Sequence, residues 1–182
     1  MEKEEWGDAQ KYQVTLENLI ENQVILMKFL EDNYGKDAIE KYYATKNEMN
    51  FQNKIGTGIK MASKLIQTLS SKKFFDMFIN QLIKQGQYMI PIKCITGIDY
   101  EPKKTIIHID KCSSKRLFKQ GIKKFKVQDQ ISVTAFCEFN CIPTFQTYGR
   151  IGNINVSAIF NEKGCDIVAE ISKGDPNSSK SD

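Results

Sequence analysis

The spacing of apolar residues changes near residue 89, and this change constrains the fold more than any other feature of the chain. Before it, apolar side chains recur every three to four positions, as in Leu16, Ile20 and Val24, which is the period of an amphipathic helix. After it, short segments rich in β-branched residues alternate with turn residues, a pattern typical of strands. The sequence therefore predicts an α+β fold, with a helical N-terminal half and a second half that contains a sheet.

The N-terminal half, residues 1–88, is mainly helical in this prediction. The first helix is expected to end at Gly35 and the last near Gly86, because glycine often follows the final turn of a helix. A polar segment between the second and third helices is predicted to be a loop. The predicted helices cover residues 11–34, 36–47, 56–69 and 74–86, and the predicted loop covers residues 47–53.

The second half, residues 89–172, predicts a hairpin, two helices and a second hairpin. Isolated hairpins are unstable in water, so we expect both to join one four-stranded antiparallel sheet with helices packed on one face. Pro143 is expected to end the second of these helices. The predicted strands are 90–98, 105–110, 153–160 and 165–172, and the predicted helices are 113–121 and 130–141. Residues 173–182 lack apolar side chains and predict a disordered tail, so that residues 1–182 form a single domain.

The net charge and the hydropathy of the chain limit the kinds of partner that we expect the protein to bind. No apolar run approaches the ~20 residues that cross a bilayer, and the acidic N-terminus lacks the pattern of a secretory signal. We therefore expect a cytoplasmic protein with no membrane partner. The net charge of +4 is small, and the lysine-rich stretch at residues 103–126 accompanies no nucleic-acid motif, so a solvated face is preferred to nucleic-acid binding. The expected partner is a small molecule, and a homodimer is left open.

Five cysteines carry the most reactive groups in the sequence. In the cytoplasm they are expected to be free thiols, ligands or nucleophiles rather than a disulfide framework. Cys94 lies in an apolar strand and is interpreted as a packing residue. Cys112 follows a strand, Cys165 opens the last strand, and Cys137 and Cys141 share one face of the expected helix. For each cysteine, a role as a small buried hydrophobe is the alternative.

Two kinds of chemistry fit these positions. Cys137, Cys141 and Cys165 could bind a transition metal such as zinc, although a zinc site needs three or four ligands and a single C-x-x-x-C pair supplies two. Alternatively, Cys137, Cys112 and Cys165 could form a catalytic set with His108, the only histidine. Both hypotheses require that cysteines distant in sequence meet in the fold.

Strand alternation makes further predictions about side-chain direction. Cys165, Ile167 and Ala169 are expected on the core face of the sheet. His108 shares the parity of Ile106 and Asp110, and Cys112 continues that parity. The cations nearest to this region are candidates for binding a substrate carboxylate. They are Lys111, Lys115 and Arg116.

The order of these motifs resembles a known family. His108-Ile-Asp-Lys-Cys112 ends a strand, Cys137-Glu-Phe-Asn140 follows on a helix, and the run from Val156 to Asp166 closes on Gly164-Cys165. This order resembles the L-2-amino-thiazoline-4-carboxylic acid hydrolase-like family, in which Asn140 stands where aspartate is frequent. The resemblance implies a helical N-terminal half and hydrolysis of a C–S or C–N bond in a thiazoline ring. The closing hairpin is also similar to the 4-vinyl reductase domain, a small-molecule-binding module.

Three functions therefore stand as hypotheses. The first is a cysteine-dependent hydrolase for a small cyclic or amide-like substrate, with Cys137 as nucleophile or ligand beside Cys112 and Cys165. The second is a 4-vinyl reductase-like sensor that binds a small molecule or a metal without catalysis. The third is a structural or partner-binding protein whose cysteines only pack. The sequence leaves open whether the protein is an enzyme.

Overall fold

The protein is described by a computed structural model at residues 7–54, 71–87, 90–150 and 153–172. Its helices precede and interrupt four strands, so the predicted α+β class is confirmed. The helices are α1 (Asp8–Tyr34), α2 (Asp37–Lys54), α4 (Ser71–Gly86), α5 (Ser113–Lys124) and α6 (Ile142–Gly149), with short 3-10 and π-helical segments η1 (Ile92–Cys94) and η2 (Cys137–Cys141). The strands are β1 (Ile95–Glu101), β2 (Lys104–Ile109), β3 (Ile154–Phe160) and β4 (Cys165–Ile171).

Two predicted segments, the helix at 56–69 and the tail at 173–182, lie outside the described residues. Within the described ranges, none of the helices combines the length and apolar character needed to span a bilayer.

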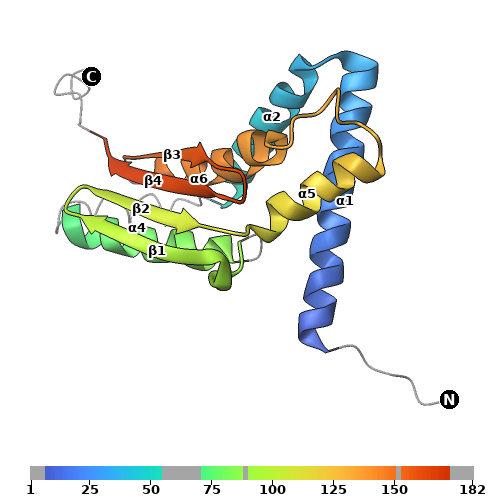
Figure 1. Ribbon diagram of the computed structural model, residues 1–182. Coiled ribbons are helices and arrows are strands. Elements are labelled where there is room, and N and C mark those ends of the chain that lie inside the picture. The colour runs from blue at the N-terminus through green and yellow to red at the C-terminus, as the bar shows by residue number, and fades with distance from the viewer. Residues whose placement is uncertain (1–6, 55–70, 88–89, 151–152, 173–182) are drawn as a thin grey trace, which may run out of the picture.

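The four strands form one antiparallel sheet in the order β1-β2-β4-β3 (Figure 1). The two predicted hairpins are confirmed, and they join through β2 and β4. In this central pairing Ile109 lies opposite Cys165, and His108 lies opposite Asp166. The end of β2 and the start of β4 are therefore neighbours, although more than fifty residues separate them in the chain.

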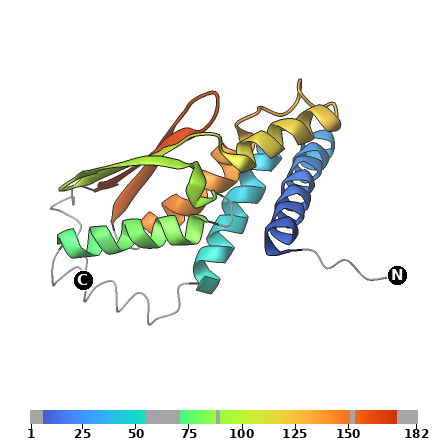
Figure 2. The ribbon, with the colours of Figure 1, turned by 60° about the horizontal axis from the view of Figure 1, so that its bottom comes forward.

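Helices α4 and α6 cover one face of the sheet (Figure 2). Because both helices are amphipathic, their apolar sides meet the apolar face of the strands and exclude water, which is the main source of stability here. In the described part of the chain, no helix covers the opposite face. The residues that meet between α4, α6 and the sheet include Leu82, Ile83, Ile107, Ile109, Phe145 and Ile167.

Helix α1 packs against α5 and α2. Its four buried apolar residues follow helical spacing, as the sequence predicts. Gly121 of α5 lies so close to Val24 that a Cβ there would stand 3.0 Å from Val24 Cγ2. The helix stops at Gly35, whose φ of 81° lies in the region that favours glycine.

The loop predicted at residues 47–53 is wrong, because α2 continues through it to Lys54. Asn47 is buried, and its Nδ2 donates to the backbone oxygen of Phe139 at 3.4 Å. The Arg150 guanidinium stacks 4.8 Å from the ring centroid of Phe51. Tertiary contacts thus keep this polar segment helical against its weak intrinsic propensity.

The helix predicted at residues 130–141 is also placed wrongly, and Pro143 does not end it. Helical structure begins at Ala135, passes through η2 and continues past Pro143 into α6. In η2 the Ile142 N–H donates to Cys137 O, which is an i→i+5 bond. Proline is tolerated in the first turn of a helix, where its missing N–H costs little, and Pro143 lies in the first turn of α6. The Asn47 side chain of α2 also donates to the Phe139 carbonyl, four residues before Pro143.

Smaller differences concern boundaries. The first strand begins at Ile95 rather than residue 90, because Pro91 caps the short segment η1. Helix α5 extends three residues beyond Gly121, to Lys124.

Candidate functional site

Four of the five cysteines are carried by three elements: Cys112 precedes α5, Cys165 begins β4, and Cys137 and Cys141 belong to η2. The predicted core face of β4 is confirmed, because Cys165, Ile167 and Ala169 are all buried. Cys112 is buried as well, so the strand parity predicted for it is wrong. Strand β2 ends at Ile109, and the chain reverses at Lys111, whose φ is 49°.

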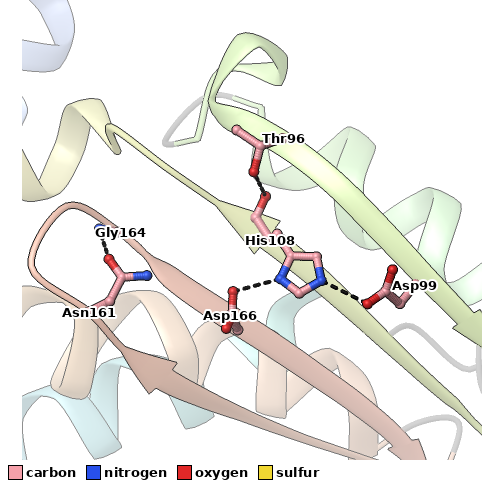
Figure 3. Close-up of polar contacts among 6 residues, drawn as sticks. All are labelled: Thr96, Asp99, His108, Asn161, Gly164 and Asp166. Atoms are coloured by element: carbon pink, nitrogen blue, oxygen red, sulfur yellow. Dashed lines mark hydrogen bonds and ion pairs between the residues drawn. The ribbon is translucent and has the colours of Figure 1, made fainter.

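The β3–β4 turn is locked against α5. Asn161 Oδ1 accepts the backbone N–H of Lys163 at 3.0 Å and of Gly164 at 2.6 Å, which fixes the turn (Figure 3). Lys115 is only 7% exposed, and its Nζ donates to the backbone oxygens of Asn161 and Gly164. The Cys112 N–H donates to Lys163 O at 3.0 Å. These contacts place Cys112 and Lys115 beside Cys165.

Gly164 is required at this junction by proximity rather than by an unusual φ. A Cβ at residue 164 would lie 1.9 Å from the Ile109 backbone oxygen, far inside van der Waals contact. The absence of a side chain lets the turn press against the end of β2. This close approach brings the chain that leads to Cys112 next to Cys165.

Cys112 occupies the N-cap position of α5. Burial raises the pKa of its thiol, whereas the backbone N–H groups of Lys115 and Ser114 and the Lys115 ammonium lower that pKa in part. These N–H groups face the sulfur without forming a regular capping hydrogen bond. A helix N-terminus and a cation favour a thiolate, so Cys112 has the most thiolate-stabilising surroundings among the clustered cysteines.

The other clustered thiols are more strongly held in the neutral form. Burial raises the pKa of Cys137 to about 12, and the nearby thiols of Cys112 and Cys165 add to that shift. Burial, with the Cys112 thiol, also raises the pKa of Cys165 to about 12. Burial raises the pKa of Cys141 well above its ordinary value. Because these shifts arise between groups that lie near one another, we group Cys112, Cys137, Cys141 and Cys165 under the name thiol cluster. Cys94 adjoins this cluster, since it also raises the pKa of Cys112.

The predicted cations divide into one that reaches this cluster and two that do not. Lys115 is buried beside the thiols, and its ammonium opposes the rise in the pKa of Cys137 and Cys165. Lys111 and Arg116 are exposed, and Arg116 donates to Gln120 on its own helix. Cys94 is buried in η1, where its sulfur contacts the Lys111 carbonyl at 3.5 Å, in keeping with a packing role.

The hypothesis of a metal site at Cys137, Cys141 and Cys165 is not supported. In the described ranges, no three Cys, His, Asp or Glu side chains are arranged to hold one metal ion. The i→i+5 bond of η2 changes the relative direction of Cys137 and Cys141 from that expected on a regular α-helix. The zinc hypothesis therefore finds no support in the described residues.

His108 is separated from the thiols by the sheet. Its Nδ1 lies 2.9 Å from Asp166 Oδ1, and its Nε2 lies 3.0 Å from Asp99 Oδ2, so the ring bridges three strands (Figure 3). Hydrogen bonds to Asp99 and then Asp166 raise the pKa of His108. All three side chains lie on the face opposite buried Cys165. The structure therefore does not bring His108 to the predicted catalytic set.

A polar cavity of about 150 Å³ lies between α1, α2, η2 and α6. Sequence reasoning missed it because its polar residues are scattered over three helices. Lys46 Nζ donates to Asn140 Oδ1 at 2.9 Å, and Asn140 is buried. The remaining lining residues combine apolar and neutral polar side chains, namely Leu19, Gln23, Asn47, Asn50, Phe51, Phe136, Thr144, Thr147 and Tyr148.

The fold and these contacts define an α+β protein with a buried thiol cluster and a separate polar cavity, linked by η2. Comparison of the chain with protein-family models, curated proteins and solved structures finds no match.

Proposed function

We propose that the protein is a cysteine-dependent hydrolase of a small cyclic thiazoline or amide-like substrate, with Cys112 as the nucleophile. The observation that carries the proposal is the convergence of Cys112, Cys137 and Cys165 around buried Lys115. Such convergence is unnecessary for cysteines that only fill space. It also agrees with the resemblance to the L-2-amino-thiazoline-4-carboxylic acid hydrolase-like family.

The nucleophile is reassigned from Cys137 to Cys112 on electrostatic grounds. Cys137 has a pKa of about 12, next to other thiols and Glu138. Cys112 faces two backbone N–H groups and the Lys115 ammonium, which stabilise the thiolate that attacks. The same N–H groups could hold negative charge that develops on the substrate. Cys137 and Cys165 would then position the substrate or donate a proton.

The reaction follows from this assignment. The Cys112 thiolate adds to the C=N or C=O carbon, and the C–S or C–N bond breaks while the leaving atom takes a proton. Water then attacks the covalent intermediate, and Cys112 departs as a thiolate. The net change is the addition of one water to the substrate. A reducing compartment such as the cytoplasm would keep the thiols in the required state.

The test uses 2-amino-thiazoline-4-carboxylate as the first substrate and mass spectrometry to detect the gain of one water. Cys112→Ser should lower kcat/KM by at least about 10³-fold, since the thiolate makes the bond to carbon. Lys124→Met is the control and should retain activity, because Lys124 is exposed and pairs with Glu21, away from the cysteines. Equal turnover by wild type and Cys112→Ser would refute the assignment.

A second candidate function is favoured by the burial of the thiols. Cys137 and Cys165 are each 7% exposed and neutral at physiological pH, which suits a sensor that binds without turnover, similar to the 4-vinyl reductase domain. Thiol labelling of the native protein and analysis of what it retains separate the candidates. A single fast thiol at Cys112 supports the hydrolase, whereas uniformly slow labelling supports cysteines that only pack. A small molecule or metal that is retained on purification, with no turnover, supports the sensor. The homodimer remains a prediction.

A further inference from the structure

The cavity between α1, α2 and α6 has an excess of hydrogen-bond donors at one end. Lys46 is half-buried, and its ammonium reaches one oxygen, Asn140 Oδ1. The ammonium also lies 5.1 Å from the centroid of the Tyr43 ring. Within the described residues, no carboxylate pairs with Lys46. Two of its three N–H donors therefore lack a protein acceptor in that part of the chain.

The neighbouring polar groups do not supply an acceptor either. The Asn140 Oδ1 is already occupied by Lys46, and the Asn140 amide nitrogen donates to no described residue. Asn47 is engaged with Phe139 and Thr144, and the Thr144 hydroxyl donates to the Asn140 carbonyl at 2.6 Å. Gln23 Oε1 accepts the Tyr43 hydroxyl at 2.6 Å. Among the described residues, Lys46 and Asn140 therefore carry donors with no protein acceptor, and Asn50 adds a further amide group to the lining.

Apolar side chains form part of the remaining wall, beside neutral polar ones such as Asn50 and Thr147. Leu19, Phe51 and Phe136 line it together with Tyr148. A cavity of about 150 Å³ is large enough for a benzene-sized body. A single cation with an amide donor matches one carboxylate rather than a doubly charged phosphate. Burial also lowers the pKa of Lys46, because the charged ammonium loses hydration. A bound anion would offset this loss by stabilising the charged form.

We propose that this cavity binds a small monocarboxylate with an apolar body, held by Lys46 and Asn140. The carboxylate accepts from the ammonium and from the Asn140 amide, and the apolar body lies against Phe51 and Phe136. The site stands apart from the thiol cluster, because no cysteine lines the cavity. The proposal therefore does not rest on the hydrolase reaction. Since Asn140 belongs to η2 together with Cys137 and Cys141, the ligand would also contact the segment that carries two of the thiols.

Benzoate is the probe, and benzamide is its uncharged counterpart of the same shape. We expect saturable benzoate binding to the full chain in an NMR titration, with a Kd of about 1 mM or tighter. Benzamide should bind at least about tenfold more weakly, because a charged hydrogen bond is lost. Equal affinity of the wild-type protein for the two compounds, or no saturation by benzoate, would overturn the proposal. This test needs no substituted protein.

Three substitutions locate the site. Lys46→Met keeps the length of the side chain and removes the charge, and it should abolish the preference for benzoate. Asn140→Asp places a carboxylate beside the ammonium and should weaken benzoate binding at least about tenfold through competition and repulsion. Lys124→Met removes an exposed cation that pairs with Glu21 and should leave binding unchanged. Benzoate affinity retained in folded Lys46→Met would refute the assignment.

The outcome is separable from that of the hydrolase proposal. Cys112→Ser should bind benzoate with wild-type affinity even where turnover is lost. Conversely, Lys46→Met should lose the preference for benzoate over benzamide whether or not Cys112 proves to be a nucleophile. Loss of benzoate binding in Cys112→Ser would contradict the separation of the two sites.

Discussion

Substitution of Gly164 by alanine tests how the thiol cluster is assembled. The new Cβ would start 1.9 Å from the Ile109 oxygen and 2.8 Å from the Ile109 carbonyl carbon, whereas ordinary contacts begin at 3.4 Å. Both partners are backbone atoms, so no flexible side chain can yield. The β3–β4 turn and the end of β2 must move apart by about 1.5 Å, which is the difference between 3.4 and 1.9 Å.

Such a movement strains the contacts that hold Cys112 beside Cys165. The Gly164 N–H donates to Asn161 at 2.6 Å, and the Gly164 carbonyl accepts from Lys115 at 3.3 Å. Overpacking of this kind costs typically 1–3 kcal/mol, and weakened hydrogen bonds of a buried amine add to it. We expect a loss of about 3 kcal/mol, which for a chain of this length lowers Tm by roughly 6–12 °C.

The measurement is thermal unfolding followed by circular dichroism, with urea unfolding for the free energy. The matched control is Gly97→Ala in β1, where a Cβ would meet the His108 ring at an ordinary 3.5 Å. That variant should stay within about 0.5 kcal/mol of wild type. A Gly164→Ala protein with the Tm of wild type would show that the close approach of the turn to β2 is not needed.

Two further predictions concern other parts of the fold. Asn47→Ala should destabilise the protein by about 1–3 kcal/mol, because the Phe139 carbonyl loses the hydrogen bond from the Asn47 side chain. The control is Thr45→Ala, on the exposed side of α2. Equal urea midpoints for the two variants would contradict this explanation. The pKa of His108 is raised above its ordinary 6.5 by Asp99 and Asp166, so its stabilising effect is complete below pH 6.5 and is lost as pH rises through the higher folded-state value. The Tm difference between wild type and His108→Gln should therefore be larger at pH 6 than at pH 9, and a difference that grows with pH would reverse the assigned sign.

Local patterns in the sequence were sufficient for most of the elements. The apolar spacing of α1 and the glycine at its end predict that helix almost residue by residue, because both signals act within a few turns. The two hairpins follow from β-branched runs around turn residues. The alternation of Cys165, Ile167 and Ala169 correctly predicts the buried face of β4.

The errors lie where a distant side chain overrides a local signal. Pro143 is a strong sign of a helix end, yet it lies in the first turn of α6, after a turn that Asn47 of another helix contacts. Asn47 itself lies in a segment whose composition favours a loop, and the same contact keeps it helical. Asn47 and the segment before Pro143 contact each other across two helices, so the structure of neither segment could be predicted from its neighbours in sequence.

Some features of the candidate site could also be predicted from local sequence, and others depend on contacts between distant residues. The sequence by itself determined the cysteines, the strand that begins with Cys165 and the glycine turn before it, since these depend on residue type and local spacing. Only the tertiary structure decided that Lys115 is buried beside the thiols, that His108 lies across the sheet, and that Lys46 meets Asn140 in a cavity. Those relations join residues between about 50 and 94 positions apart. They arise from the pairing of β2 with β4 and from the packing of helices against one another and against the sheet, which no local pattern encodes.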